Sequence, residues 1–295
     1  MHLPSRPTAR QLLEDQIRAA CVLEATAQKP GNVHPLHSFI NLTYNDFVVS
    51  ADRVAPILAC TPELGVGRAI LDAVTATQAG VGRNTNLGIV LLLAPLAAVS
   101  PGVRLADGIA GVLAGLTRED AELVYESIRL AHPGGMGQVD NQDISMPPTQ
   151  TLLEVMRLAA GRDLIARQYA ENFSIVLDFG LPYFNAVSDF EKHWEAAIIG
   201  LQLELLSRHA DSLIVRKCGQ EIADEATRRA KVVLKAATPG TPNAQVELDR
   251  FDRWLRTGGN GRNPGTTADL IAASLFAAIR DGKVPIVSPP WGSGW

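Results

Sequence analysis

Apolar residues recur at three- and four-residue spacing along most of the chain, in stretches rich in alanine, leucine and charged residues. This spacing places the apolar side chains on one face of a helix. Strand-like alternation is limited to short β-branched pieces such as Ile214-Val215, so the sequence predicts an all-α fold. The helices are expected at about 10–28, 46–60, 66–79, 86–99, 117–131, 149–171, 189–208, 219–237, 244–257 and 264–280.

The segment from Asn84 to Val103 contains no charged residue and includes the most apolar stretch of the chain. A membrane-spanning helix needs about 20 predominantly apolar residues, whereas polar residues and prolines interrupt this segment at both ends and in the middle. We therefore expect a buried central helix and no membrane partner. The other helices are expected to surround it in a single-domain bundle over residues 1–287, and the Pro/Gly-rich residues 288–295 to form a tail.

Side chains that can cap a helix mark several of the expected starts. Thr117 with Asp120, and Ser188 with Glu191, have the spacing of a capping box. Asn263-Pro264 combines a preferred N-cap with a proline at the first helical position, so a helix is expected to begin there. The long loop at 133–148 is either a lid or an ordinary surface loop.

Composition narrows the class of protein. A chain of 295 residues with 46% hydrophobic content can bury a large core without disulfides or a structural metal. A net charge of -4 lacks the positive field that nucleic-acid binding requires. Cys21, Cys60 and Cys218 lack metal-ligand spacing, and residues 1–10 are not followed by an apolar signal segment. These features predict a cytoplasmic protein with reduced thiols.

The first of four polar clusters follows the first expected helix and comprises Glu24 and residues 29–34. Pro30 ends the helix and Gly31 permits an unusual turn, so Lys29, Asn32 and His34 could face a ligand. The alternative is a solvated helix end, in which Lys29 binds the last carbonyl groups.

The second cluster is the glycine-rich segment 80–88, which leads into the expected central helix. Free backbone N–H groups at a helix start can bind an anion. The segment lacks the Gly-Lys-Ser/Thr ending of a Walker A loop. Asn84, Thr85 and Asn86 need polar partners, which either a ligand or internal hydrogen bonds could supply.

The third cluster contains Asp211 and Ser212 upstream of two adjacent cations, Arg216 and Lys217. The cations suit a polyphosphate. An intrahelical ion pair between Asp211 and the cations is the alternative.

The fourth cluster spans residues 263–269 and contains Asn263, Gly265, Thr266, Thr267 and Asp269. Gly265 would let a ligand approach the free N–H groups of the helix start, and the threonines add hydroxyl donors. Asp269 lies one turn further on, where it could hold magnesium or accept a proton.

Taken in order, the four clusters resemble the motifs of the triphosphoribosyl-dephospho-coenzyme A synthase family, which are Lys-Pro-Gly-hydrophobic, Asn-Thr-His-Lys-Gly, Asp-Thr-Asn with a downstream Arg and Gly, and Ser-Pro-Gly-Gly-Ser-Ala-Asp-Leu. The resemblance covers about residues 20–280. Asn86-Leu87 stands where the family has His-Lys, and an Arg-Gly-Glu element is absent, so the chain is identified as a divergent member.

The resemblance implies an all-α enzyme that transfers the triphosphoribosyl group of ATP to the 2′-hydroxyl of dephospho-coenzyme A, or a related acceptor, and releases adenine. Such a transfer passes through an oxocarbenium-like state that an acid and a carboxylate can assist. On this model Asp269 and Asp211 are the catalytic candidates, and magnesium is bound by Asp269, Asp211 and Glu24. The substrate-binding candidates are Lys29, Asn32, His34, Asn84, Thr85, Asn86, Arg216, Lys217, Asn263, Gly265, Thr266 and Thr267.

Two other functions remain open on the sequence alone. One is phosphoryl transfer or hydrolysis on a nucleotide-like substrate, and the other is non-catalytic nucleotide binding. The apolar helices are also compatible with a homodimer. If the clusters are functional, Asp269→Asn and Lys29→Ala should each abolish turnover and leave the melting temperature nearly unchanged.

Overall fold

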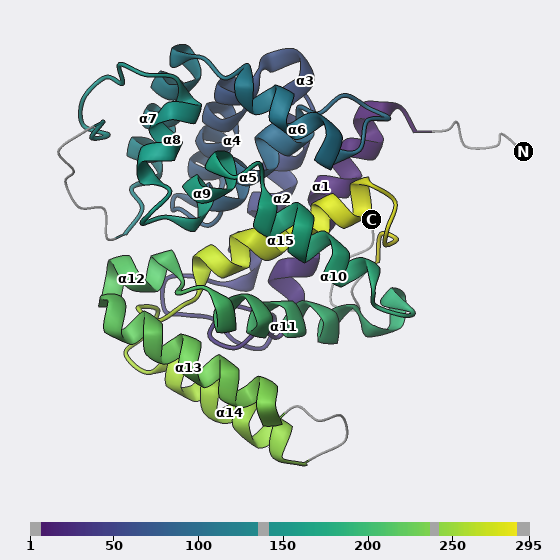
Figure 1. Ribbon diagram of the computed structural model, residues 1–295, viewed down its shortest axis with the longest axis vertical. Coiled ribbons are helices and arrows are strands. Elements are labelled where there is room, and N and C mark those ends of the chain that lie inside the picture. The colour runs from purple at the N-terminus through teal and green to yellow at the C-terminus, as the bar shows by residue number, and fades with distance from the viewer. Residues whose placement is uncertain (1–6, 135–141, 237–241, 288–295) are drawn as a thin grey trace, which may run out of the picture.

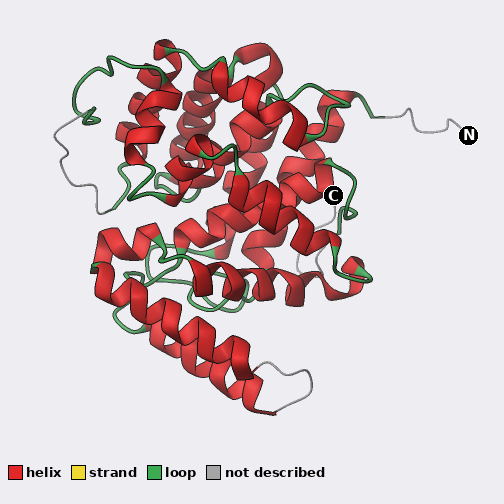
Figure 2. Cartoon of the chain, viewed as in Figure 1, coloured by secondary structure: helices red, strands yellow, loops and turns green. Residues whose placement is uncertain are grey.

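The computed structural model describes residues 7–134, 142–236 and 242–287. Over these ranges the chain forms fifteen α-helices and one π-helix and contains no strand, which confirms the expected all-α fold (Figure 2). The elements are α1 (Ala9–Thr26), α2 (Tyr44–Leu58), α3 (Thr61–Leu64), α4 (Val66–Val81), α5 (Leu87–Ala97), α6 (Leu105–Ala114), α7 (Arg118–Ala131), α8 (Leu152–Ala159), α9 (Leu164–Ala170), the π-helix η1 (Ile175–Gly180), α10 (Leu181–Asn185), α11 (Phe190–Arg208), α12 (Ser212–Cys218), α13 (Gln220–Ala236), α14 (Pro242–Arg256) and α15 (Gly265–Arg280).

The helix expected at 149–171 is two helices. Asp163 interrupts it, because its side chain accepts hydrogen bonds from the N–H groups of Ile165 and Ala166 and so caps a new helix, α9. Helix α6 was not expected from the sequence, because its Gly108 and Gly111 lower helix propensity. The short elements α3, η1, α10 and α12 were not expected either. The tail at 288–295 and part of the loop at 133–148 lie outside the described residues.

The helix caps agree with the sequence in one case of three. Thr117 and Asp120 form the expected capping box at the start of α7. The box at Ser188 is wrong, because α11 is preceded by Asp189 in a left-handed conformation without a side-chain cap. α15 begins one residue later than expected, at Gly265, because the Asn263 side chain accepts a hydrogen bond from Asn32 and does not cap the helix.

The expected central helix is α5, which is buried along its length apart from Gly88. It packs against α15, α4 and α2, and α15 crosses the middle of the molecule as the second buried helix (Figure 1). Within the described ranges, no helix is both long enough and apolar enough to cross a membrane. The apolar segment around α5 thus forms part of the protein core.

A second, smaller core lies between α11 and the helices α12, α13 and α14. α11 joins the two cores, because Leu201 and Leu205 face the main core whereas Leu203 and Leu206 face the smaller one. α13 and α14 pack against each other and project from the lower end of the molecule in Figure 1. That residues 1–287 form a single domain stays a prediction.

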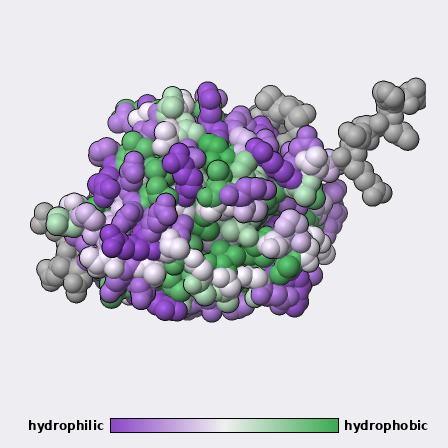
Figure 3. Space-filling model, turned by 90° about the horizontal axis from the view of Figure 1, so that it is seen from above, coloured by the Kyte–Doolittle hydropathy of each residue, from purple (hydrophilic) through white to green (hydrophobic). Residues whose placement is uncertain are grey.

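The surface mixes hydrophilic and hydrophobic residues. On the face shown in Figure 3, hydrophobic residues appear in patches between hydrophilic ones. Such patches are normal, because apolar atoms make up roughly 55–60% of the surface of folded proteins. They do not identify a partner, and the homodimer stays a prediction.

Candidate active site

The four polar clusters lie together around the first turns of α15. Asn32 of the first cluster donates a hydrogen bond from Nδ2 to Asn263 Oδ1 of the fourth, at 2.6 Å. Asp211 of the third cluster accepts two hydrogen bonds from Thr267, one from the backbone and one from the hydroxyl. Helix α5, which follows the second cluster, packs against α15. Segments up to about 230 residues apart in sequence therefore form one site.

Gly88 and Asp269 connect the second cluster to the fourth. A Cβ atom built at Gly88 would overlap the Asp269 carboxylate, so only glycine allows this close approach. Gly88, Asp269, Asn84, Thr85 and Arg216 are partly exposed, whereas most of the remaining predicted residues are buried. Together with the exposed Lys217 and the partly exposed Asn263 and Gly265, these five residues form the accessible part of the site.

Asp269 is the carboxylate of the site that lacks a partner. Its carboxylate makes no hydrogen bond or ion pair with any residue that the structure describes. Burial raises the pKa of Asp269 well above its usual value, and the negative charges of Glu24 and Asp211 raise it further. The charges of Glu24 and Asp269 also raise the pKa of the Cys21 thiol, after the larger effect of burial. Burial and the neighbouring charges therefore favour the protonated form of the Asp269 carboxyl group.

Lys29 and Glu24 form a buried ion pair beneath Asp269. Lys29 Nζ lies 2.9 Å from Glu24 Oε1, and the two side chains are 0% and 4% exposed. Lys29 Nζ also donates to the backbone carbonyl groups of Glu24 and Ala27 at the end of α1. Lys29 therefore does not face a ligand, as the first expectation had it. It binds the last carbonyls of α1, as the alternative predicted, but it is buried there and not solvated.

His34 is also turned inward. It is buried, its backbone pairs with that of His37, and burial lowers its pKa to about 4, with further lowering by Arg256 and Lys29. At neutral pH the imidazole is therefore uncharged. His34 does not supply the positive charge that a phosphate would require.

The polar residues before α5 have internal partners. Asn84 Oδ1 accepts a hydrogen bond from the Leu87 N–H at 3.0 Å. The hydroxyl groups of Thr85 and Ser50 share a hydrogen bond at 2.6 Å, and Thr77 donates to Asn86 Oδ1 at 3.1 Å. Of the two explanations left open by the sequence, the structure shows the internal one. Asn86 is buried against α4, whereas Asn84 and Thr85 remain partly exposed.

Asp211 holds two helices together. Its Oδ1 accepts the N–H groups of Leu213 and Ile214 at the start of α12, and its Oδ2 accepts the N–H and hydroxyl of Thr267 in α15. Burial raises the pKa of Asp211, while the bonds from Thr267 and from α12 act in the opposite direction. Both oxygens of Asp211 are thus engaged by protein donors, and the catalytic or metal-binding role expected from the sequence stays a prediction.

The start of α15 is likewise closed by protein atoms. The Thr267 N–H binds Asp211, and Thr266 Oγ1 accepts the Leu213 N–H at 3.2 Å. A Cβ atom at Gly265 would lie 2.5 Å from Leu213 Cδ2. Gly265 is therefore needed for packing against α12, which corrects the expectation that it admits a ligand, and Thr266 and Thr267 fix α12 in place.

The two cations of α12 differ in their surroundings. Arg216 pairs with Asp163 at 2.5 Å, not with Asp211, so the intrahelical ion pair is not formed. Arg216 Nε is buried without a partner among the described residues, and the Arg216 charge lowers the pKa of Asp269. Lys217 is exposed and donates to the Asn260 carbonyl at 3.4 Å. Arg216 therefore places positive charge close to Asp269.

A model of the ATP:dephospho-CoA triphosphoribosyl transferase family matches residues 10–286 of the chain. The chain belongs to this family. A solved structure from Archaeoglobus fulgidus assigned as a triphosphoribosyl-dephospho-CoA synthase is 28% identical to this transferase, with a TM-score of 0.61. The alignment covers 79% of the transferase and 98% of that chain. A search of curated proteins gave no match. The resemblance inferred from the four motifs is thereby confirmed.

The transferase offers few carboxylates for a metal ion. The described residues contain no group of three or more His, Cys, Asp or Glu side chains that could hold one. Glu24 is paired with Lys29 and Asp211 is saturated by N–H and hydroxyl donors, which leaves Asp269. This arrangement fits Mg²⁺, which usually takes one or two carboxylates and completes its shell with water and substrate phosphates.

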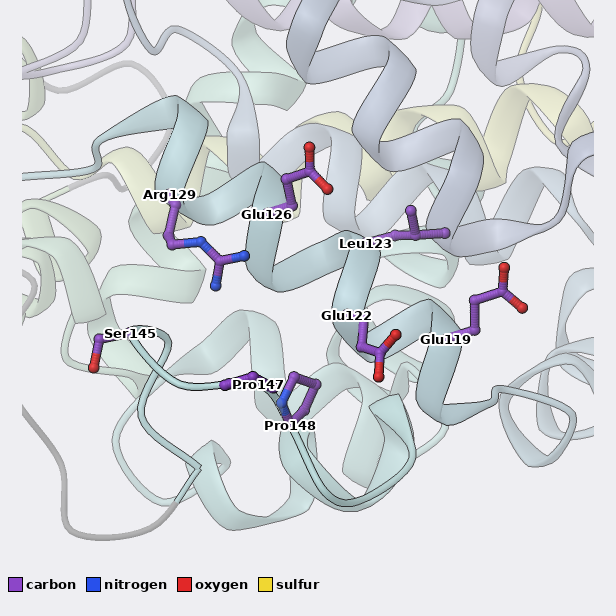
Figure 4. Close-up of a pocket in the computed structure, with 8 residues that line it drawn as sticks. All are labelled: Glu119, Glu122, Leu123, Glu126, Arg129, Ser145, Pro147 and Pro148. Carbon is purple, nitrogen blue, oxygen red and sulfur yellow. The ribbon is translucent and has the colours of Figure 1, made fainter.

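Two cavities among the described residues were compared with ATP, and neither combines the size and the charge that ATP requires. One of about 400 Å³ lies between α7 and the following loop, and its charged lining residues are Glu119, Glu122, Glu126 and Arg129 (Figure 4). It contains no predicted site residue, and its charge would repel a triphosphate. The other lies beside Cys21, Ser50 and Asn86 and has a volume of about 10 Å³, which admits about one water molecule.

Residues from other helices that were not expected from the sequence support the site. Gln202 of α11 and Arg256 of α14 bind Asn32, and Asp163 at the start of α9 binds Arg216. Each lies far from its partner in sequence and outside the four motifs. Their spacing within their own helices carried no signal that would have identified them.

Gly88→Ala tests the contact between α5 and Asp269. The added methyl group would displace the Asp269 carboxylate, so we expect the rate of adenine release to fall at least about 100-fold. Alanine favours a helix over glycine by about 1 kcal/mol, so α5 should still form. Gly111→Ala in α6 is the control, since its Cβ would meet no atom within 4 Å. Equal activity of the two variants, measured by chromatography of adenine, would contradict this role of Gly88.

Proposed function

We propose that the transferase moves the triphosphoribosyl group of ATP onto the 2′-hydroxyl of dephospho-CoA at the site around Asp269, with adenine as the leaving group. Family membership supports the reaction. The observation that carries the location is the partly buried Asp269 carboxyl group, which has no partner among the described residues and packs against Gly88. All four polar clusters meet beside it.

Asp269 is proposed as the acid that assists departure of adenine. The acceptor oxygen forms a bond to C1′ of the ribose while the bond from C1′ to the adenine nitrogen breaks, and the electron pair of that bond remains on adenine. The proton of Asp269 goes to adenine, and the proton released by the attacking hydroxyl restores the acid. The raised pKa of Asp269 supports this assignment, because it favours the protonated form of the carboxyl group that a general acid needs.

Arg216 and Lys217 are proposed to contact the triphosphate. Both cations lie in the last turn of α12, where Arg216 is partly exposed and Lys217 is exposed, and the Arg216 charge acts on Asp269. Among the described residues, Lys217 makes one long hydrogen bond to a carbonyl, so its charge is available to a phosphate. Asn84, Thr85 and Asn263 are proposed to bind sugar and phosphate oxygens at the same edge.

Magnesium is proposed to enter with ATP. When bound, the ion neutralises part of the triphosphate charge. Because Glu24 and Asp211 are engaged by protein donors, most of its oxygen ligands would come from the triphosphate and water. A cytoplasmic location is proposed as well, supported by three free cysteines, Cys21, Cys60 and Cys218.

The direct test is to incubate the purified protein with ATP, magnesium and dephospho-CoA and to separate the products by chromatography with mass detection. We expect free adenine together with a triphosphoribosyl adduct of the acceptor, and no adduct when the acceptor is omitted. Formation of ADP, AMP or phosphate without adenine would contradict the proposal and indicate phosphoryl transfer. ATP binding without any product would indicate a non-catalytic protein.

A further inference from the structure

Gln202 is a fully buried glutamine of α11 that contacts the first cluster of the site. Its Nε2 donates to the Pro30 carbonyl at 2.9 Å and to Asn32 Oδ1 at 2.7 Å. Its Oε1 is buried and has no partner among the described residues. The two hydrogen bonds of Nε2 therefore define how this carboxamide is oriented.

The orientation of Gln202 is determined by the backbone. A carbonyl oxygen can only accept a hydrogen bond, so the side of Gln202 that faces Pro30 must be its NH₂ group. The same NH₂ group faces Asn32, which must then present its oxygen. Asn32 in turn directs its own NH₂ group to Asn263 Oδ1, at 2.6 Å.

Asn263 is the last member of this chain of amides. Because its oxygen accepts the bond from Asn32, its NH₂ group is left free, and this group has no partner among the described residues. Asn263 is partly exposed and directly precedes the first turn of α15. Two N–H donors at this position suit an oxygen-rich ligand group such as a phosphate.

We propose that Gln202 is a positioning residue for the transfer: through Asn32 it turns the Asn263 carboxamide so that the free N–H groups of Asn263 face the triphosphate or ribose oxygens of ATP. Without the donors of Gln202, Asn32 and Asn263 can rotate and present an oxygen to those oxygens. The inference rests on the proposed function only in taking ATP as the ligand.

Gln202→Met is the principal variant, because methionine has a similar length and lacks hydrogen-bond donors. We expect the KM for ATP to rise about tenfold, as for loss of one hydrogen bond to a charged group, with kcat changed less than about threefold. Gln202→Glu, which replaces the donors by oxygens, should raise the KM further if it folds. Ser127→Ala in α7 is the control, since Ser127 is buried and donates only to Leu123 of its own helix.

A double-mutant cycle with Asn263→Ala separates positioning from a general loss of structure. If Gln202 acts through Asn263, Gln202→Met should have almost no further effect on ATP affinity once Asn263 is alanine. The same cycle measured with inorganic triphosphate shows which part of ATP Asn263 contacts. If Asn263 contacts the phosphates, the loss of affinity persists with triphosphate; if it contacts the ribose, the loss disappears. Additive losses in the two backgrounds, or an unchanged KM in a folded Gln202→Met variant, would overturn the proposal.

Calorimetry keeps this test independent of the reaction. ATP affinity can be measured for each member of the cycle whether or not adenine is released. If the wild-type protein binds ATP without releasing adenine, the proposed function is contradicted. The double-mutant cycle on ATP affinity then still tests the role of Gln202. A wild-type protein that does not bind ATP would overturn the inference itself.

Discussion

Asp269→Asn is expected to reduce the rate of adenine release by roughly 10²- to 10⁴-fold, the usual contribution of a general acid. Asparagine has the size of aspartate, so the contact with Gly88 is retained, but it cannot donate a proton to adenine. The rate should be measured by chromatography of free adenine. Asp224→Asn, at an exposed position of α13, is the matched control and should leave the rate unchanged.

The pH dependence follows from the raised pKa of Asp269. As an acid, Asp269 is active when protonated, so kcat of the wild type should be constant at low pH and fall as pH rises through the folded-state pKa. The free energy of unfolding depends on pH in the same direction. A carboxyl group with a raised folded-state pKa contributes stability that is complete below its unfolded pKa and is lost as pH rises through its folded pKa.

Asparagine at position 269 lacks this titration, so Asp269→Asn should unfold at the same or higher urea concentration than wild type at pH 8. Full activity of Asp269→Asn would exclude Asp269 as the acid. A large loss of stability in this variant at pH 8 would instead show that the Asp269 carboxylate has a structural partner.

Lys29→Ala is expected to destabilise the protein by about 3–5 kcal/mol, because it leaves the buried Glu24 carboxylate without its cation. This replaces the expectation from the sequence that the melting temperature would hardly change. The variant also loses the hydrogen bonds to the last carbonyls of α1. Urea denaturation followed by circular dichroism measures the effect.

The double variant Lys29→Met with Glu24→Gln identifies the cause. Both charges are then absent, so most of the stability should return, as is common when a buried ion pair is replaced as a unit. If the double variant is as unstable as Lys29→Ala, the helix-end hydrogen bonds and packing of Lys29 dominate over the ion pair. An unchanged urea midpoint for Lys29→Ala would contradict the burial of the pair.

Helix prediction succeeded where local chemistry decided the conformation. Thr117 and Asp120 cap α7 through contacts three residues apart, and the apolar spacing of α5 and α15 reflects faces that are buried in the core. The prediction was wrong at Ser188 and at 149–171. There Asp189 precedes its helix in a left-handed backbone conformation and Asp163 caps its helix with its side chain, and several polar residues can do either.

The sequence by itself determined the all-α class, the buried central helix and the order of the four clusters, because helix periodicity, capping and short motifs are local properties. Only the tertiary structure decided the direction of each polar side chain. Lys29 turns to Glu24, Asp211 to Thr267 and Arg216 to Asp163, because a buried polar group must find a partner and the nearest one belongs to another helix or loop. Asp269 is the carboxylate left without such a partner, and only the packing of α5 against α15 reveals it.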